Sequence, residues 1–216
     1  MEQYQKNSNS YSDALNTINK KYNSISLLRL LSVLLCFVLG YYYIKTADSV
    51  YSISAVLSFL GFIVLMRIHS RLSFQKKLTE ALLKINKNEI IFLKREKLPF
   101  ENGQEFIDFH HPYAYDLDIF GDHSLFQSLN RTGTFVGKKT LANQLLYTLE
   151  SNEINKNQEA IRELKPKLDW RQEFLALAIV GQDTKVAYEA LLKWKDSKSA
   201  PFSKVMSILM YALPVL

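Results

Sequence analysis

The chain has 216 residues, of which 48% are hydrophobic, and a formal net charge of +6. This length allows one or two domains with a core, and the single cysteine, Cys36, excludes an internal disulfide framework and a cysteine-based zinc site. The modest positive charge does not by itself indicate nucleic-acid binding, because the strongest basic clusters flank two apolar runs, where anionic lipid headgroups explain them at least as well.

These two apolar runs predict a two-helix membrane hairpin over residues 26–67, preceded by a polar cytosolic segment, 1–25. The runs, Leu27–Ile44 and Val50–Met66, are each close to the roughly 20 residues that a helix needs to cross a bilayer. Arg29 is the only charge in either run, and its long side chain can reach the headgroups from near the helix end. Aromatic residues near the run ends fit an interfacial belt: Tyr41, Tyr42, Tyr43 and Tyr51.

The distribution of cations predicts the orientation of this hairpin. Lysines and arginines precede the first run and follow the second, whereas only Lys45 lies in the turn between them. The positive-inside rule therefore predicts a cytoplasmic-membrane protein with both ends of the hairpin in the cytoplasm and membrane lipid as a partner. A cleaved signal peptide is disfavoured, because about 25 mostly polar residues come first. The alternative is a helical hairpin buried in a soluble protein.

Residues 68–122 are predicted to be an amphipathic helix followed by an irregular linker. Apolar residues recur at helical spacing after Met66, among them Leu72, Leu78, Leu82 and Ile85. Residues 90–93 are expected to form a short strand, and residues 97–122 carry the prolines, glycines and polar residues of a linker.

Residues 123–200 are predicted to be helical, which makes the fold class mainly α. A short helix capped by Ser124 or Asp122, a turn at Thr132–Thr134 and a helix over 135–149 come first. A longer apolar pattern over 151–180 is interrupted by Pro166, which predicts a kink or a break, and Gly181 is expected to terminate it. A last helix spans about 183–195, with Ala187, Leu191 and Trp194 facing inward.

The final segment, 201–216, is predicted to be the start of a truncated apolar segment. Residues 205–216 contain no charge and no polar terminator, yet twelve residues are too few to span a bilayer. The chain is therefore expected to be part of a longer protein. An apolar tail packed on the helices is the alternative.

Three candidate ligand sites overlap in residues 110–140, and each departs from its pattern. An EF-hand starting at Asp116 would place Phe120 where an oxygen ligand is required and Gln127 where a bidentate glutamate is required. A P-loop over 133–140 would have one residue too few between its glycines and would lack Ser or Thr after Lys138. Six residues are potential transition-metal ligands: His110, His111, Asp116, Asp118, Asp122 and His123. Their spacing matches no known metal site, and capping of backbone N–H groups is the simpler role for them.

No catalytic, cofactor or metal residue is predicted in the chain. It has no Gly-x-Ser-x-Gly elbow, and no nucleophile is marked by its sequence context. Arg131, Lys138 and Lys139 are candidates for phosphate contacts, with a solvated helix face as the alternative use of the two lysines.

The stretch HPYAYDLDIFGDHSLFQSLNRTGTFVGKKTLANQLL, residues 111–146, resembles the start of the helical core, or lever, domain of MutS-family DNA mismatch repair ATPases. The membrane-associated MutS-related branch is the most similar. Six residues match the family pattern L-x-x-L-x-R-T-x-T-x-x-G-x-x-x-L in register: Leu129, Arg131, Thr132, Thr134, Gly137 and Leu141. Leu125 lies one position before the first leucine of the pattern. Asn130 stands where relatives often carry Asp. A second segment, NQEAIRELKPKLDWRQEFLALA over 157–178, resembles the core helices that follow.

The resemblance implies a helical core leading to a C-terminal ABC-type ATPase domain that binds ATP and magnesium, forms a homodimer and takes part in DNA binding or mismatch repair. The Walker A, Walker B and signature motifs of that domain do not occur in these 216 residues, nor does the mismatch-reading domain. Thr132–Gly137 would then be a capped turn between helices, with Gly137 allowing close helix packing. Two other functions stay open: a small membrane-anchored adaptor that binds a protein partner, and the membrane half of an ABC-like exporter.

Overall fold

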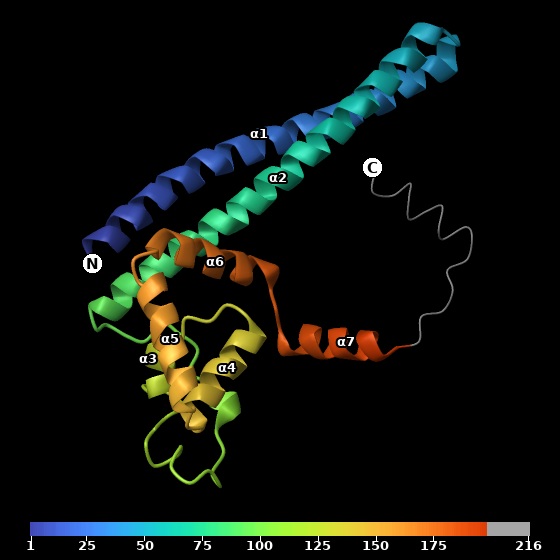
Figure 1. The fold of residues 1–216 in the computed structure, drawn as a ribbon. Coiled ribbons are helices and arrows are strands. Elements are labelled where there is room, and N and C mark those ends of the chain that lie inside the picture. Colours follow the sequence, from blue (N-terminus) through green and yellow to red (C-terminus); the bar gives the residue numbers. More distant parts are fainter. Residues whose placement is uncertain (198–216) are drawn as a thin grey trace. The chain divides into compact units, whose positions relative to one another are not determined.

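The computed structural model describes residues 1–197 and consists of helices in that range, without a β-strand (Figure 1). This confirms the mainly α fold class. Within residues 1–197 the chain forms seven α-helices and one 3-10 turn: α1 (Glu2–Thr46), α2 (Ser49–Leu93), η1 (Gln104–Phe106), α3 (Leu125–Leu129), α4 (Phe135–Leu146), α5 (Ser151–Leu164), α6 (Leu168–Gly181) and α7 (Lys185–Asp196). The predicted apolar segment 201–216 lies outside the described residues.

The contacts divide the chain into two units. Among the described residues, the helical unit comprises Met1–Ala14 and Lys77–Leu192, and the hairpin unit comprises Leu15–Lys76 together with residues 193–197. The segment 1–25, predicted to be cytosolic, forms the beginning of α1, and its part Met1–Ala14 belongs to the helical unit.

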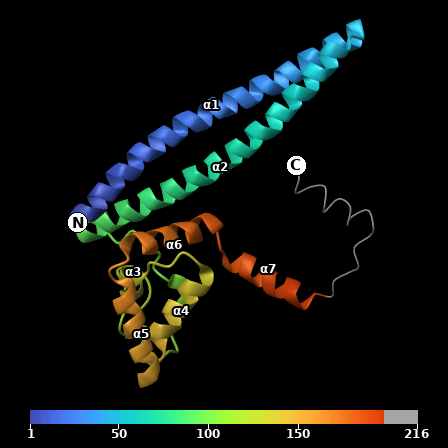
Figure 2. The same ribbon diagram turned by 45° about the horizontal axis from the view of Figure 1, so that its top comes forward.

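The hairpin unit pairs the later part of α1 with the earlier part of α2 in antiparallel orientation (Figure 2). The Ser58 hydroxyl donates to the Ser32 carbonyl at 2.9 Å, and the Cys36 thiol lies 3.7 Å from the Ala55 carbonyl. Small residues and such hydrogen bonds are typical of helices that pack in lipid. Both helices are long and apolar enough to cross a membrane, and no residue in the most apolar 18-residue stretch of either one is buried.

The first core of the helical unit surrounds a buried amide pair. Asn86 on α2 and Gln172 on α6 exchange two hydrogen bonds of 3.0 Å, and the Asn7 amide on α1 donates to the same Gln172 oxygen at 3.5 Å. Apolar residues of α2 and α6 pack around this pair: Ala81, Ile85, Ala176, Leu78, Leu82, Leu175 and Val180. The polar pair fixes the position of three helix segments relative to one another, because a shift would leave buried amides without partners.

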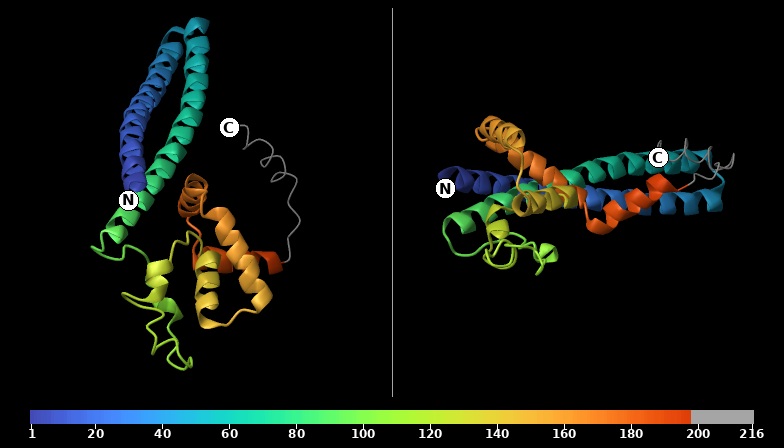
Figure 3. Two further views of the ribbon diagram at one scale, coloured as in Figure 1. Left: turned by 60° about the vertical axis from the view of Figure 1, so that its left-hand side comes forward. Right: turned by 60° about the horizontal axis from the view of Figure 1, so that its bottom comes forward.

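The second core anchors the long connection between α2 and α3. This connection runs mostly as turns (Figure 3), and its Ala114, Ile119 and Phe120 are buried together with Phe126 of α3 and Ala142 of α4. The Phe120 and Phe126 rings lie 5.3 Å apart. The predicted irregular linker is therefore irregular in backbone but contributes core residues.

Four local predictions need correction. Residues 90–93 are helical rather than a strand, because α2 continues to Leu93 and buries Ile90. The helix predicted over 135–149 ends at Leu146. Pro166 does separate α5 from α6, but the left-handed residue after α6 is Gln182, with φ of 51°, rather than Gly181. Three residues of α7 are expected to face inward but are exposed, Leu191 by 57% and Trp194 by 74%: Ala187, Leu191 and Trp194.

Candidate functional site

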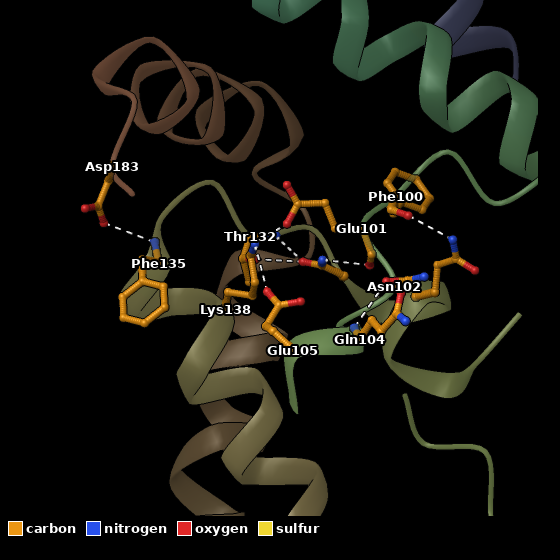
Figure 4. Close-up of polar contacts among 11 residues, drawn as sticks. Phe100, Glu101, Asn102, Gln104, Glu105, Thr132, Phe135, Lys138 and Asp183 are labelled. Carbon is orange, nitrogen blue, oxygen red and sulfur yellow. Dashed lines mark hydrogen bonds and ion pairs between the residues drawn. The ribbon is translucent and has the colours of Figure 1, made fainter. Parts of the chain in front are cut away.

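The candidate site is the junction between α3 and α4, where both the phosphate-contact candidates and the family pattern fall. Ser124 caps α3, since its hydroxyl accepts from the Gln127 N–H at 3.1 Å. Thr134 caps α4 in the same way, accepting from the Gly137 N–H at 3.0 Å. Asp183 satisfies a further N–H of the first turn of α4, that of Phe135, at 3.1 Å (Figure 4).

Asn130 holds the connection between the two caps. Its side-chain oxygen accepts from the Thr132 N–H at 3.0 Å and from the Thr132 hydroxyl at 2.7 Å, and its amide donates to the Glu101 carbonyl at 3.1 Å. An aspartate could accept at this position but could not donate to Glu101. The asparagine is therefore suited to tying the turn to the long connection.

Arg131 ties the turn to α2. Its guanidinium donates to both carboxylate oxygens of Glu89, at 2.5 and 3.2 Å, and to the Ser128 carbonyl at 2.9 Å. It also lies over the rings of Phe100 and Phe92, 3.4 and 4.8 Å from their centroids. A phosphate at Arg131 would have to compete with Glu89 for the bidentate face of the guanidinium.

Lys138 is engaged by two carboxylates of the long connection. Its ammonium forms ion pairs with Glu101 and with Glu105, the second at 3.3 Å (Figure 4). Burial lowers the pKa of Lys138, but the hydrogen bonds and charges of Glu101 and Glu105 outweigh it, so that the pKa lies above its ordinary value. Lys139, the third phosphate candidate, is exposed.

Gly133, and not Gly137, is the glycine that allows close packing. A Cβ on Gly133 would lie 2.8 Å from the Ala178 Cβ and 2.9 Å from the Leu175 Cδ1, both on α6. The nearest atom to a Cβ on Gly137 would be the capping hydroxyl of Thr134, at 2.9 Å. The expectation that Gly137 permits helix packing is therefore wrong in detail, since its neighbours belong to its own turn.

The leucines in and next to the family pattern differ in their surroundings. Leu125 and Leu129 are 49% and 50% exposed, whereas Leu141 packs against the second core. Leu125 and Leu129 therefore contribute little to the core of the helical unit, although their spacing is that of a helix face.

Two cavities lie beside the junction and share Arg131, Thr132 and Gly133 in their walls. The larger, of about 720 Å³, contains the Arg131 and Lys138 ion pairs, so these two cations already have carboxylate partners there. The smaller, of about 410 Å³, is mainly apolar and includes Trp170 and Phe174 of α6, whose rings are stacked 5.4 Å apart. Trp170 and Phe174 are 53% and 63% exposed.

The structure does not gather the metal-ligand candidates. The His111 Nδ1 faces the N–H groups of Tyr113 and Ala114, His110 lies 3.5 Å from Asp108, and Asp122 accepts from the Asn102 amide at 2.7 Å. Asp118 and His123 occupy left-handed positions, with φ of 48° and 62°. Across residues 1–197, no three His, Cys, Asp or Glu side chains are arranged to hold a metal ion. Asp118 and His123 therefore shape turns of the long connection.

Sequence reasoning missed the partners of the junction. Glu89, Glu101 and Glu105 look like ordinary charges of a helix and a linker, and nothing in their local spacing identifies them. Their role depends on contacts between segments that lie far apart in the sequence. Glu89 and Arg131, for example, are 42 positions apart, and only the tertiary structure brings them together.

Comparison with known proteins gave no match: no family model, no curated protein and no solved structure matches this chain.

Proposed function

We propose that this chain is the membrane-anchoring and core region of a MutS-related ATPase. The hairpin unit would anchor the protein in the cytoplasmic membrane with both of its ends in the cytoplasm, and the helical unit would correspond to the start of the lever region. ATP, magnesium, DNA and the homodimer contact would then belong to parts of the protein outside residues 1–216, as the resemblance implies.

One observation carries the assignment of the helical unit. The polar residues of the resembling pattern form a single connected junction, in which Thr134 caps α4, Thr132 is held by Asn130, and Arg131 reaches α2 through Glu89. A rigid joint between helices suits a lever that transmits movement. The uncovered apolar helices of the hairpin unit support the anchor, since water-exposed apolar surface of this extent is unfavourable.

The size of the native protein tests the ATPase part of this proposal. An antibody against residues 150–195 should detect, in detergent-extracted membranes, a protein far larger than the 25.0 kDa of this chain. The same band should be labelled by a photoreactive ATP analogue in the presence of magnesium. A native product no larger than this chain would overturn the proposal.

Selective labelling tests the membrane part. Single cysteines at Thr46 and at Gln75, in a Cys36→Ser background, should differ in their reaction with a thiol reagent that does not cross membranes. In intact cells, only the cysteine at position 46, in the turn, should react, since both ends of the hairpin are proposed to be cytoplasmic. Reaction at position 75 alone would reverse the topology, and equal reaction at both would contradict a membrane hairpin.

A membrane-anchored adaptor is the second candidate, and the smaller cavity favours it. The exposed Trp170–Phe174 pair beside an apolar wall is the kind of surface that accepts an apolar side chain from a partner protein. A photoreactive residue at position 174 should then crosslink to a discrete protein in membranes, while the same residue at the exposed position 159, on α5, should not. A native band at the mass of this chain, together with this crosslink, would favour the adaptor over the ATPase.

A further inference from the structure

Arg29 lacks a counter-charge on the parts of α1 and α2 that form the hairpin, Leu15–Thr46 and Ser49–Lys76. It lies in the apolar part of α1, and neither hairpin helix carries an Asp or Glu near it: none occurs in residues 14–47 or 49–79, and Asp48 lies in the turn at the other end. A charge in an apolar environment is costly unless it is paired. The partner of Arg29 must therefore come from outside the hairpin.

A groove on the hairpin unit lies beside Arg29. It has a volume of about 600 Å³, and its lining changes in character along the helix axis. Asn23, Ser26 and Arg29 provide the polar groups at one end, with Leu27 among them; Leu30 and Val33 continue the groove along α1 with apolar side chains, and Phe62 of α2 adds an apolar wall. Residues 23, 26, 30 and 33 follow the i, i+3, i+7, i+10 spacing of one helix face and cover about 15 Å along the axis.

The polar end of this groove lies where the apolar runs end. The antiparallel register pairs Ser32 with Ser58 and Tyr22 with His69, so that residues near 24 on α1 lie level with residues near 67 on α2. Arg67 directly follows the second apolar run, and Arg29 is only about 3 Å further along the axis than Leu27, where the first run begins. A headgroup region at this level would meet the guanidinium of Arg29.

We propose that this groove binds a glycerophospholipid, with the lipid phosphate on Arg29 and an acyl chain along Leu30, Val33 and Phe62. The planar guanidinium can hold two phosphate oxygens at once, and the Asn23 amide and Ser26 hydroxyl are donors for the remaining phosphate and ester oxygens. The order of polar and apolar residues along the groove matches the order of headgroup and chain in a lipid. This site rests on the proposed membrane location of the hairpin.

Spin-labelled lipids test the site in the full-length chain. The protein is reconstituted into phosphatidylcholine vesicles containing a trace of spin-labelled phosphatidylglycerol, and the motionally restricted lipid is measured. Arg29→Gln should reduce the binding constant for the labelled lipid about five-fold, the effect of one cation at a membrane surface. Val33→Trp, which fills the groove and keeps every charge, should reduce it as well.

Lys21→Gln is the matched control, because it removes one positive charge from the same end of the hairpin but outside the groove. Equal losses in Lys21→Gln and Arg29→Gln would overturn the site and leave only general attraction between the basic end and anionic lipid. Unchanged binding in Val33→Trp would also overturn it. Displacement of the labelled lipid by inorganic phosphate, at matched ionic strength, would show that an anion alone suffices and would contradict a lipid site.

Flotation of the vesicles separates failure of this site from failure of the proposed membrane anchor. If the protein does not float with the vesicles, the membrane location itself is wrong and the site falls with it. If it floats but Arg29→Gln binds the labelled lipid as the unchanged protein does, the anchor stands and the lipid site is refuted.

Discussion

At the scale of single residues, Gly133 is the position where the smallest change should have a clear effect. Gly133→Ala places a methyl group 2.8 Å from Ala178 and 3.2 Å from the Leu175 carbonyl, and backbone atoms of a helix cannot move easily. We expect a loss of about 1–3 kcal/mol in the free energy of unfolding of the helical unit. Urea denaturation of the detergent-solubilised protein, followed by tryptophan fluorescence, measures this loss.

Gly181→Ala is the matched control for Gly133→Ala. A Cβ at Gly181 would meet no atom within 4 Å, and the residue is the last of α6. Alanine there should leave the unfolding midpoint unchanged or raise it slightly, because alanine favours the helix. Similar destabilisation by both substitutions would mean that the close approach of Gly133 to α6 is not the cause.

Arg131 allows a second prediction at the same scale. Arg131→Gln should destabilise the helical unit by about 2 kcal/mol, because Glu89 loses a bidentate partner while its side chain is only 15% exposed. Arg131→Lys should recover only part of this stability, since an ammonium can neither bind both oxygens in the same fork nor lay a planar group over the Phe100 and Phe92 rings. Full stability in Arg131→Gln would show that the residue is free for another role, such as a phosphate contact.

At the scale of helices, the Asn86–Gln172 pair should behave as a unit. Gln172→Leu alone leaves the buried Asn86 amide without its partner and should cost about 1–3 kcal/mol. Changing both residues to leucine should cost much less than the sum of the two single changes, because neither of the two buried amides then remains without the other. A double-mutant cycle on urea midpoints measures the coupling, and additive effects would contradict the pairing.

The contact between the start of α1 and α6 should weaken at high pH. Burial, with the charges of Asp169 and Glu173, raises the pKa of Tyr11 above 10.0. The folded state therefore favours the neutral phenol, and this stabilisation is complete below pH 10 and lost as the pH rises through the folded-state pKa. Between about pH 8 and about pH 11, the urea midpoint of the unchanged protein should fall more than that of Tyr11→Phe. Parallel curves would refute this.

The elements differ in how far their sequence reveals them. Apolar runs, Pro166 and the cap at Ser124 were sufficient to predict the hairpin helices, the break between α5 and α6, and the start of α3. The strand predicted for residues 90–93 is wrong, because β-branched and aromatic residues also occur at the end of a packed helix. Here Ile90 is buried and the Phe92 ring contacts the Phe100 ring. Nor does the polar sequence of residues 1–14 show that its Asn7 and Ser8 face a core, since no apolar stripe marks that face.

At the scale of the whole molecule, membership of the helical unit does not follow the order of the chain. Its segment Met1–Ala14 and its residues from Lys77 onward are separated by the entire hairpin, yet Asn7 and Asn86 reach the same oxygen of Gln172. Hydropathy divides the sequence where the apolar runs begin, because hydropathy reports the environment of a segment. Contacts divide it at Ala14 and Lys77, because they report which segments stabilise one another.

This division predicts that the helical unit folds without the hairpin, provided that residues 1–14 are kept. Replacing Leu15–Lys76 by a Gly-rich linker of about six residues, enough to join neighbouring helices, should give a water-soluble helical protein in which Gln172→Leu is still destabilising. Removing residues 1–14 as well should lower its urea midpoint, since Gln172 then loses Asn7 and the cavity beside Ile85 loses Tyr4. Equal midpoints with and without residues 1–14 would place the start of α1 outside the folded unit.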